Sequence, residues 1–398
     1  MKFHHRLTFV TALLLLFILL LSSPLKDFYE DRSNYADKTT YRRWIRRPFG
    51  SEKQALLMAH ETSPYDIKNE SVQDKMVAMP TTPLEKHIHI LVHARMRTGS
   101  SVTGSLFNNL PDFFYVYEPG HMIVEDKQLD LYADSFKYLE TIRPDLVSFL
   151  RSIYNCSFGG KTFYTRSLQR HHFMRQNSKA LAGVKTPIRE GDLERICSQK
   201  KHIVVKTVRL NNVVLAEAAL RENNVRVIHV VRDPRAMMLS RRNMQHLSGT
   251  ERNNRASRGV FEYRLEKIIK DYCKWLEDNY ISVEQGSEWM KNQYLLIRYE
   301  DLIDRPVPFV AKMFKFAGLP LDNDTVARIQ SADWWRGHGE EWRSHVTFKE
   351  VARVHKLCPD SVFRRFGYKK LLNESQLTDN STSVVLPLEY TDLNPQLV

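Results

Sequence analysis

The sequence predicts an α/β domain over residues 86–372: one doubly wound, mostly parallel sheet with helices on both faces. Short apolar runs rich in β-branched and aromatic residues recur along this region. Each run ends in a polar loop, and stretches with helical spacing lie between the runs. Runs this apolar are typical of strands buried on both faces, which is the environment of a parallel sheet covered by helices.

Five runs are predicted to be strands, and they lie at residues 87–92, 113–117, 203–205, 225–231 and 294–297. The run 225–231 is the clearest because its core is β-branched. Helical spacing follows the first run, from Ser101 through Leu106 and Phe107. The chain of 398 residues is therefore expected to hold one large domain plus appendages.

The N-terminal region has the pattern of a membrane-anchored protein. Residues 1–6 are basic and are expected to face the cytosol, and residues 7–25 are expected to form a signal-anchor transmembrane segment. Its apolar run is short for a span, which needs about 20 residues, so a cleaved signal peptide is the alternative. Residues 26–85 are polar and irregular, which predicts a stem that holds the domain in the lumen.

Cysteines and sequons agree with an oxidising lumen. Four widely spaced cysteines without a CxxC pair favour two disulfides among Cys156, Cys197, Cys273 and Cys358. Three connectivities are possible, and buried free thiols are the alternative. Five Asn-x-Ser/Thr sequons permit glycosylation, at Asn69, Asn155, Asn323, Asn373 and Asn380. Residues 373–398 are expected to form a polar, loosely ordered tail.

The chain is strongly basic, with a formal net charge of +13. Such an excess favours an anionic partner, which could be nucleic acid, an anionic membrane or an anionic substrate, and a merely solubilising surface is the alternative. Hydrophobic residues make up 42%, enough for a buried core, which argues against a disordered chain. With the domain in the lumen, we expect no nucleic acid partner.

A candidate anion site follows the first predicted strand, where the sequence reads Arg95-Met96-Arg97-Thr98-Gly99-Ser100-Ser101. In open α/β sheets, ligands bind at the carboxyl ends of strands, where helix N-termini direct N–H groups at anions. Gly99 lets the backbone approach a phosphate, the serines add hydroxyl donors, and Arg97 adds a permanent charge. The loop is not a Walker A motif, because GxxxxGK[ST] is absent. A plain capped turn is the alternative.

A second candidate anion site, Arg232-Asp233-Pro234-Arg235, follows the strand 225–231. Pro234 stands where a helix would begin, which its fixed φ favours. Ser240 lies about two helical turns after Arg232, so the two side chains are expected on a similar face and could hold one phosphate. A polar helix start with a solvated arginine is the alternative.

Two anion sites without a dinucleotide fingerprint suit a nucleotide with separate 5′ and 3′ phosphates. On these motifs the chain resembles the Golgi carbohydrate sulfotransferases of the galactose/N-acetylgalactosamine/N-acetylglucosamine 6-O-sulfotransferase family. The loop 97–101 matches the family's 5′-phosphosulfate loop, and residues 230–236 with Ser240 match its 3′-phosphate motif. Further family-like strings follow in the family's order, and they are Phe107-Asn108, Tyr117-Glu118-Pro119, Lys206-Thr207-Val208-Arg209, Arg298-Tyr299-Glu300-Asp301-Leu302, Ala317-Gly318-Leu319-Pro320, Trp342-Arg343 and Phe366-Gly367-Tyr368. The four cysteines also fall where the family usually has them.

The resemblance implies the P-loop-like fold of sulfotransferases that use 3′-phosphoadenosine 5′-phosphosulfate (PAPS), with PAPS as co-substrate and no metal. It implies that PAPS is bound by Arg97, Thr98, Gly99, Ser100, Ser101, Arg232 and Ser240. Sulfuryl transfer is an in-line displacement that needs positioning, charge stabilisation and a base for the acceptor hydroxyl. The implied catalytic residues are Glu118, Lys206 and Arg97.

Glu118 is the expected general base, and a helix-capping or salt-bridged carboxylate is the alternative for it. His121 is the rival base, but here only Gly120 separates it from Glu-Pro, whereas the family has two residues there. Lys206 is expected to steady the bridging oxygen of the donor, a role compatible with a salt bridge to Glu118. Arg209 is expected to contact sulfate or acceptor.

Other polar and aromatic residues can be explained by structural roles. Glu300 and Asp301 are expected to make structural hydrogen bonds at a strand end. Tryptophans 334, 335 and 342 could stack on adenine or sugar, but core packing is the commoner role. Val102 replaces the aromatic residue common after Gly-Ser-Ser in the family, which predicts altered packing.

Two rival functions share parts of this pattern. A lumenal glycosyltransferase would want a DxD metal site, which Asp322-Asn323-Asp324 formally supplies. An inactive module that holds sulfated glycans would use the basic groove without turnover. The resemblance instead points to an enzyme of the Golgi membrane, single-pass type II, whose acceptor is a 6-hydroxyl of a glycan or glycosaminoglycan. A homo-oligomer is compatible with the sequence.

Overall fold

The computed structural model describes residues 87–129, 136–246, 255–331 and 339–388. The expected cytosolic segment, signal anchor and stem lie outside these residues, as do Trp334 and Trp335. Within the described part, no helix is both long and apolar enough to cross a bilayer. The fold below is that of the compact unit formed by residues 81–245 and 252–398, as far as the structure describes it.

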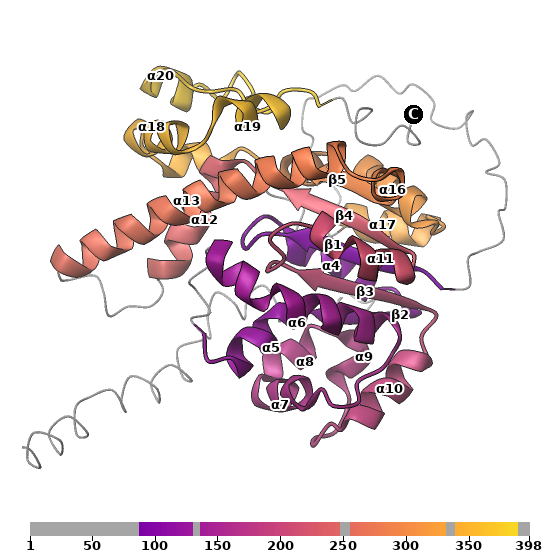
Figure 1. Cartoon of the computed structure of the whole chain (residues 1–398). Coiled ribbons are helices and arrows are strands. Elements are labelled where there is room, and N and C mark those ends of the chain that lie inside the picture. The colour runs from indigo at the N-terminus through magenta and orange to yellow at the C-terminus, as the bar shows by residue number, and fades with distance from the viewer. Residues whose placement is uncertain (1–86, 130–135, 247–254, 332–338, 389–398) are drawn as a thin grey trace, which may run out of the picture. The chain divides into compact units, whose positions relative to one another are not determined.

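Five parallel strands form one sheet in the order β2-β3-β1-β4-β5 (Figure 1). The strands are β1 (His89–Ala94), β2 (Phe113–Tyr117), β3 (His202–Thr207), β4 (Val225–Val231) and β5 (Tyr294–Arg298). All five predicted strands are confirmed, and the bounds of the second and fourth match without a shift. The register pairs His89 with Ile203 on one side and with Val225 on the other.

Helices connect and cover these strands, as Figure 1 shows. Between β1 and β3 lie α4 (Ser100–Asn108), α5 (Pro119–Asp126), α6 (Phe136–Tyr154), α7 (Thr162–Arg170), α8 (His172–Gln176), α9 (Lys179–Ala182) and α10 (Glu190–Ser198). The middle of the chain holds a 3₁₀ turn (Val214–Ala216), α11 (Glu217–Glu222), α12 (Pro234–His246), α13 (Arg255–Glu284) and α14 (Glu288–Asn292). After β5 come α15 (Tyr299–Asp304), α16 (Pro306–Ala317), α17 (Asn323–Ser331), a 3₁₀ turn (Glu341–His345), α18 (Phe348–Leu357), α19 (Asp360–Arg365) and α20 (Glu374–Thr378).

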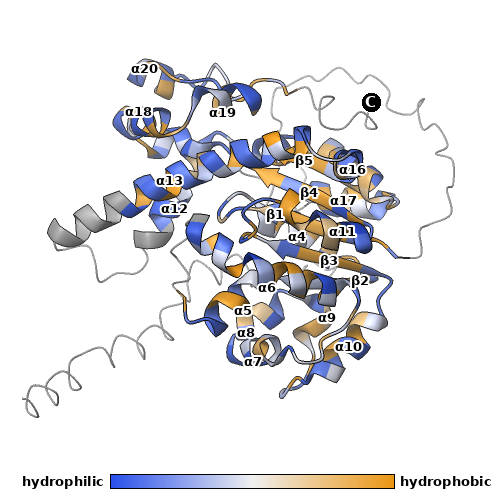
Figure 2. Cartoon of the chain, in the orientation of Figure 1, coloured by the Kyte–Doolittle hydropathy of each residue, from blue (hydrophilic) through white to orange (hydrophobic). Residues whose placement is uncertain are grey.

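The sheet is buried on both faces, as its apolar strands predict, and Figure 2 shows the strands coloured mainly as hydrophobic. Successive side chains of a strand point to opposite faces. Leu91 therefore packs into a core covered by α5, α6, α7, α10, α11 and α13. Its neighbours Ile90 and Val92 pack into a second core covered by α4, α15, α16 and α17. The doubly wound α/β fold is confirmed.

Two disulfides join distant parts of the chain. Cys156, just after α6, pairs with Cys197 in α10, and Cys273 in α13 pairs with Cys358 after α18. The expectation of two disulfides is confirmed, and the structure selects one of the three connectivities. Disulfides that close loops of this length, with sequence separations of 41 and 85, typically contribute about 2–5 kcal/mol each to stability.

The first part of the expected loose tail packs against the domain, so that expectation is wrong for residues 373–388. Leu377 and Val384 are buried in a small core with Trp342, and Tyr368 forms a β-bridge with Val385. The buried guanidinium of Arg343 donates hydrogen bonds to main-chain carbonyls of this segment, at Gln376, Leu377, Asp379 and Thr382. The sequence pattern did not indicate this packing, because the apolar residues Leu377 and Val384 stand among polar residues.

Candidate functional site

The candidate site lies at the carboxyl ends of four strands. After β1 the chain forms the edge strand β2 and then β3, which lies between β2 and β1, and β4 and β5 extend the sheet on the other side of β1. The order of connection thus reverses between β1 and β4, and ligands of doubly wound sheets bind at such a switch point. The two predicted anion loops follow these two strands.

The loop Arg95–Gly99 turns from β1 into α4 through left-handed backbone conformations. Gly99 has φ 97° and Arg97 has φ 71°. A Cβ atom on Gly99 would overlap the ring of Tyr299, so glycine is needed here both for its φ and for space. No described side chain caps the N-terminus of α4. The first amides of this helix are therefore available for an anion.

The hydroxyl residues of this loop differ in exposure. The hydroxyl of the buried Thr98 donates to the carbonyl of Arg95 at 2.8 Å, so it holds the shape of the loop. Ser100 is buried at the start of α4, whereas Ser101 and Arg97 are exposed. Of the predicted ligands in this loop, Thr98 thus has a supporting position, and Arg97 and Ser101 face solvent.

The second anion loop meets the first at Arg97. α12 begins at Pro234 as predicted. The Nη1 atom of Arg232 donates to the carbonyl oxygen of Arg97 at 3.2 Å, and Nε of Arg97 donates to the hydroxyl of Ser240 at 2.9 Å. Residues more than 130 positions apart in the sequence are thereby gathered at one point, with two guanidinium groups beside an uncapped helix N-terminus.

Two tyrosines that the sequence analysis did not single out position Arg232. The hydroxyl of Tyr272, in α13, accepts from the amide of Arg232 at 3.0 Å and donates to its carbonyl at 2.7 Å. The guanidinium lies 4.5 Å from the ring centroid of Tyr299, a cation–π contact. Among the described residues, no group bonds the buried Nε of Arg232. This arginine is thus held in place, and its Nε–H group remains available to a ligand.

A buried network beneath the second loop gives Glu300 and Asp301 the structural roles expected for them. Glu300 accepts from the amide of Asp233 at 2.9 Å and from the hydroxyl of Tyr368 at 3.0 Å. Burial and the nearby charge of Asp233 raise the pKa of Glu300 to about 7. Asp301 binds the guanidinium of Arg298 through both oxygens. These carboxylates hold the loop and are not exposed to a substrate.

Glu118 binds two buried cations at the other end of the site. It follows β2 and has φ 47°, a strained value for a non-glycine residue. One carboxylate oxygen pairs with Nζ of Lys206, and the other accepts from Nη1 of Arg209 at 2.7 Å. The side chains of Lys206 and Arg209 are 1% and 3% exposed. The salt bridge to Lys206 is the alternative that the sequence left open for Glu118, whereas the one to Arg209 was not anticipated.

The charge balance around Glu118 fixes its protonation state. Burial by itself raises the pKa of this carboxyl, but the positive charges of Lys206 and Arg209 outweigh burial, and the net pKa lies well below its ordinary value. Glu118 is therefore an ionised carboxylate at neutral pH. Lys206 and Arg209 carry two positive charges against the one negative charge of Glu118, so these three side chains together have a net charge of +1.

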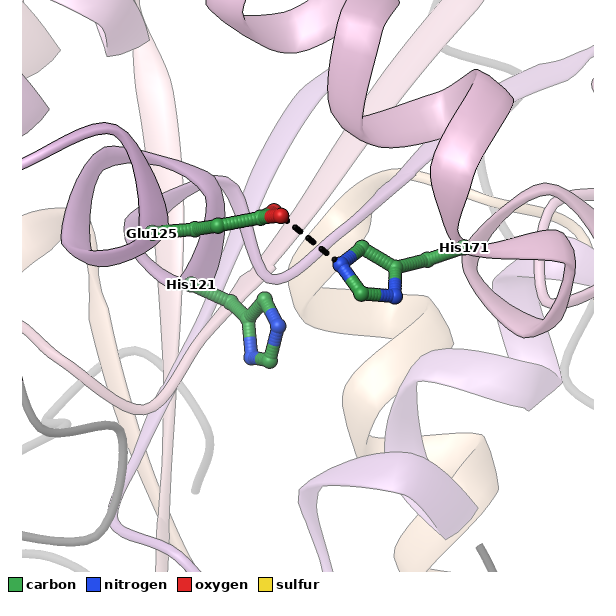
Figure 3. Close-up of side chains that lie close together, drawn as sticks. All are labelled: His121, Glu125 and His171. Atoms are coloured by element: carbon green, nitrogen blue, oxygen red, sulfur yellow. Dashed lines mark ion pairs between the residues drawn. The ribbon is translucent and has the colours of Figure 1, made fainter. Parts of the chain in front are cut away.

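His121 stands one helical turn after Glu118, in the first turn of α5. Burial, assisted by the charge of Arg209, lowers the pKa of His121 to about 4, so the ring is neutral at neutral pH. It lies beside Glu125 and His171, a grouping that the sequence analysis did not find (Figure 3).

The remaining sequence candidates have structural positions. Asp322 accepts from the amide of Thr325 at 2.7 Å and so caps α17, which is a local role for the DxD-like string. Trp342 is buried against the guanidinium of Arg235, at 4.7 Å from its ring centroid. Val102 packs beside the core under α4.

Comparison with known proteins identifies the family of the chain. The family model for the sulfotransferase domain matches residues 87–333. Carbohydrate sulfotransferase 1 of Homo sapiens is 30% identical over 363 residues, covering 78% of this chain and 86% of that protein. Carbohydrate sulfotransferase 1 of Mus musculus is 29% identical, with 79% and 86% covered, and carbohydrate sulfotransferase 6 of Homo sapiens is 25% identical, with 77% and 88% covered.

Solved structures show weaker likeness. The sulfotransferase domain from the curacin biosynthetic pathway aligns with 79% of this chain and 96% of its own, at a TM-score of 0.35 and 15% identity. The sulfotransferase STF9 from Mycobacterium avium aligns at a TM-score of 0.36 and 13% identity, with 71% and 76% covered. On the family match and the curated relatives, the chain belongs to the sulfotransferase domain family, and it is an enzyme of that family.

Proposed function

We propose that this sulfotransferase moves a sulfuryl group from PAPS to a carbohydrate hydroxyl by in-line displacement. The observation that supports it most is the meeting of the two anion loops at the switch point. Arg232 and Ser240 both contact Arg97, and the free amides of α4 lie in the same loop. A nucleotide with separate 5′ and 3′ phosphates needs two such adjacent anion sites.

The residues present suit this co-substrate. The buried Nε of Arg232 has a donor to spare, and a phosphate oxygen is the partner that a guanidinium binds best. Arg97, Thr98, Gly99, Ser100 and Ser101 would hold the 5′ side, through backbone amides and the charge of Arg97. PAPS, when bound, supplies the activated sulfuryl group. We expect no metal ion to take part in holding it.

Glu118 is the proposed base, and Lys206 and Arg97 the proposed charge stabilisers. Glu118 is ionised, as a base must be, but its two cations make it weak. Lys206 would turn from Glu118 toward the donor as negative charge develops there. That movement would free one carboxylate oxygen to accept the proton of the acceptor hydroxyl.

A carbohydrate acceptor is proposed because the curated relatives are named carbohydrate sulfotransferases. The resemblance in sequence favours the 6-hydroxyl of galactose, N-acetylgalactosamine or N-acetylglucosamine, in a glycan or glycosaminoglycan. The net charge of +13 favours an acidic chain through electrostatic steering, which salt should weaken.

We place the enzyme in the Golgi membrane, with domain boundaries as the sequence predicts and the catalytic domain in the lumen. The two disulfides suit that oxidising compartment, and the four described sequons have exposed asparagines. Peptide N-glycosidase should therefore increase the electrophoretic mobility of the protein made in animal cells. Unchanged mobility would argue against a lumenal domain.

Transfer of radiolabelled sulfate tests the function directly. The purified full chain is incubated with labelled PAPS and defined oligosaccharides that differ in their terminal sugar and charge. We expect label in one or a few acceptors. Binding of PAPS or of a glycan without transfer would support an inactive binding module, and transfer of sugar from a nucleotide sugar would support a glycosyltransferase.

A further inference from the structure

Three metal-ligand side chains gather beside α5, outside the residues proposed for sulfuryl transfer. His121 and Glu125 stand four residues apart on α5, which places them on one face of the helix. His171 comes from the junction of α7 and α8. One ligand atom from each residue lies within 4.8 Å of the others. Figure 3 shows the Glu125 carboxylate and the His171 ring pointing at one another with the His121 ring beside them.

The three side chains are half-buried, and a neighbouring residue fixes the carboxylate. Nε2 of His171 lies 3.0 Å from Oε1 of Glu125. The other oxygen of Glu125 accepts from the hydroxyl of Ser167 at 2.7 Å, which fixes the carboxylate. The rings of His121 and His171 meet edge to face at a centroid distance of 5.8 Å. Among the described residues, nothing bonds the buried Nε2 of His121.

We propose that His121, Glu125 and His171 bind a divalent transition-metal ion, with Zn²⁺ the preferred ion. Two imidazoles and one carboxylate are a ligand set that Zn²⁺ accepts, with a fourth position left for water. Zinc–nitrogen bonds of about 2.0 Å place tetrahedral ligand atoms roughly 3.3 Å apart. Small side-chain rotations would close the present spacing to that value.

The supporting hydrogen bond fits the pattern of a metal site. Ligating groups are usually fixed by an outer partner, and here Ser167 supplies that partner to the carboxylate. All four cysteines of the chain are in disulfides, so no thiolate competes for zinc. The bound ion would tie α5 to the start of α8, and α5 begins directly after Glu118.

Arg170 is the group that a metal must displace. Its guanidinium contacts Oε1 of Glu125, the oxygen that also faces His171. The Arg170 side chain is 56% exposed, so it can turn into solvent. Removing this positive charge should therefore strengthen metal binding. If Glu125 served only as the salt-bridge partner of Arg170, removing Arg170 would not strengthen metal binding.

Zinc titration of the full chain tests the proposal. The protein is purified without a histidine tag, treated with chelator, and titrated with Zn²⁺ by calorimetry. Co²⁺ replaces Zn²⁺ in a parallel titration, since four-coordinate Co²⁺ absorbs visible light. We expect one ion per chain. His121→Ala and His171→Ala should each weaken binding by more than the about 10- to 100-fold typical of losing an outer partner.

Matched variants make the outcome unambiguous. His172→Ala removes the adjacent, exposed histidine and should leave metal affinity unchanged. Ser167→Ala should weaken binding about 10-fold, and Arg170→Ala should tighten it. The absence of saturable binding would overturn the proposal, as would equal loss of affinity in His172→Ala and His171→Ala. Because metal binding is measured without PAPS or acceptor, its failure leaves the proposed sulfuryl transfer untouched.

Discussion

Replacing Glu118 by glutamine removes the proposed base with almost no change of shape. The amide cannot accept a proton, so the acceptor hydroxyl must lose its proton to water. Loss of a general base typically costs about 100-fold or more in turnover, which corresponds to about 2.7 kcal/mol of activation free energy. We therefore expect the kcat of Glu118→Gln to fall at least about a hundredfold.

The same substitution also disturbs stability, because the carboxylate neutralises two buried cations. Glu118 is 13% exposed, and its partners Lys206 and Arg209 are almost fully buried. Removing one partner of a buried ion pair costs about 3–5 kcal/mol. Glutamine keeps one acceptor oxygen, so we expect a loss near the lower end of that range. Urea unfolding of both proteins measures it.

The stability difference has a defined pH dependence. The pKa of Glu118 is depressed in the folded protein, so its contribution is fully present above the ordinary value of 4.5 and is lost as pH falls toward the folded pKa. The gap in unfolding free energy between wild type and Glu118→Gln should therefore be constant near neutral pH. It should shrink as pH falls below that ordinary value.

A matched control separates catalysis from folding. Glu222 also receives two hydrogen bonds from a cation, Arg151, but the pair is 43% and 55% exposed. Glu222→Gln should lose less than about 1 kcal/mol and keep full turnover. Sulfate transfer is then measured at a temperature where all three proteins are folded. Near-normal kcat in folded Glu118→Gln would refute the assignment and move the role of base toward His121.

Three further substitutions test the rest of the site. Arg232→Ala should mainly raise the KM for PAPS, because it removes a ground-state contact; a loss of kcat alone in steady-state kinetics contradicts that role. Gly99→Ala should abolish transfer and lower stability in urea unfolding, because a side chain at φ 97° costs about 1–3 kcal/mol and overlaps Tyr299; wild-type stability would show that the loop adapts. The pKa of Glu300 is raised to about 7, so between pH 4.5 and 7 this carboxyl takes up a proton on folding. The stability of the wild type should therefore fall as pH rises through that range, and Glu300→Gln should remove this pH dependence. An equal slope in the variant would assign the dependence to other groups.

Local patterns were enough to predict the sheet and the two anion loops. The strand 225–231 was visible because a run of β-branched residues between polar ones is a local feature. Pro234 marked the start of α12 for an equally local reason, its fixed φ. A general rule placed both loops at the carboxyl ends of strands, where ligands of open α/β sheets bind, but the contact between Arg97 and Arg232 was not predicted.

Contacts made by side chains across long sequence distances could not be predicted in this way. Tyr272 lies in the middle of a long helix, and nothing in its neighbourhood indicates that its hydroxyl binds the backbone of Arg232. Arg209 pairs with Glu118 across 91 positions. His171 reaches α5 only because α7 folds back on it. Such contacts depend on how helices pack, which hydrophobic periodicity leaves open.

In the proposed mechanism, the pairing of Glu118 with Lys206 would connect donor binding to the strength of the base. With both cations in place, the carboxylate is stabilised as an anion and holds a proton poorly. If Lys206 turns toward the donor, Glu118 loses the nearer of its two charges and its pKa must rise, because the remaining cation no longer outweighs burial as strongly. The proposed base would then gain strength only when the activated sulfuryl group is present. Lys206→Met would uncouple the two events, because the carboxylate would keep the same partners whether or not the nucleotide is bound.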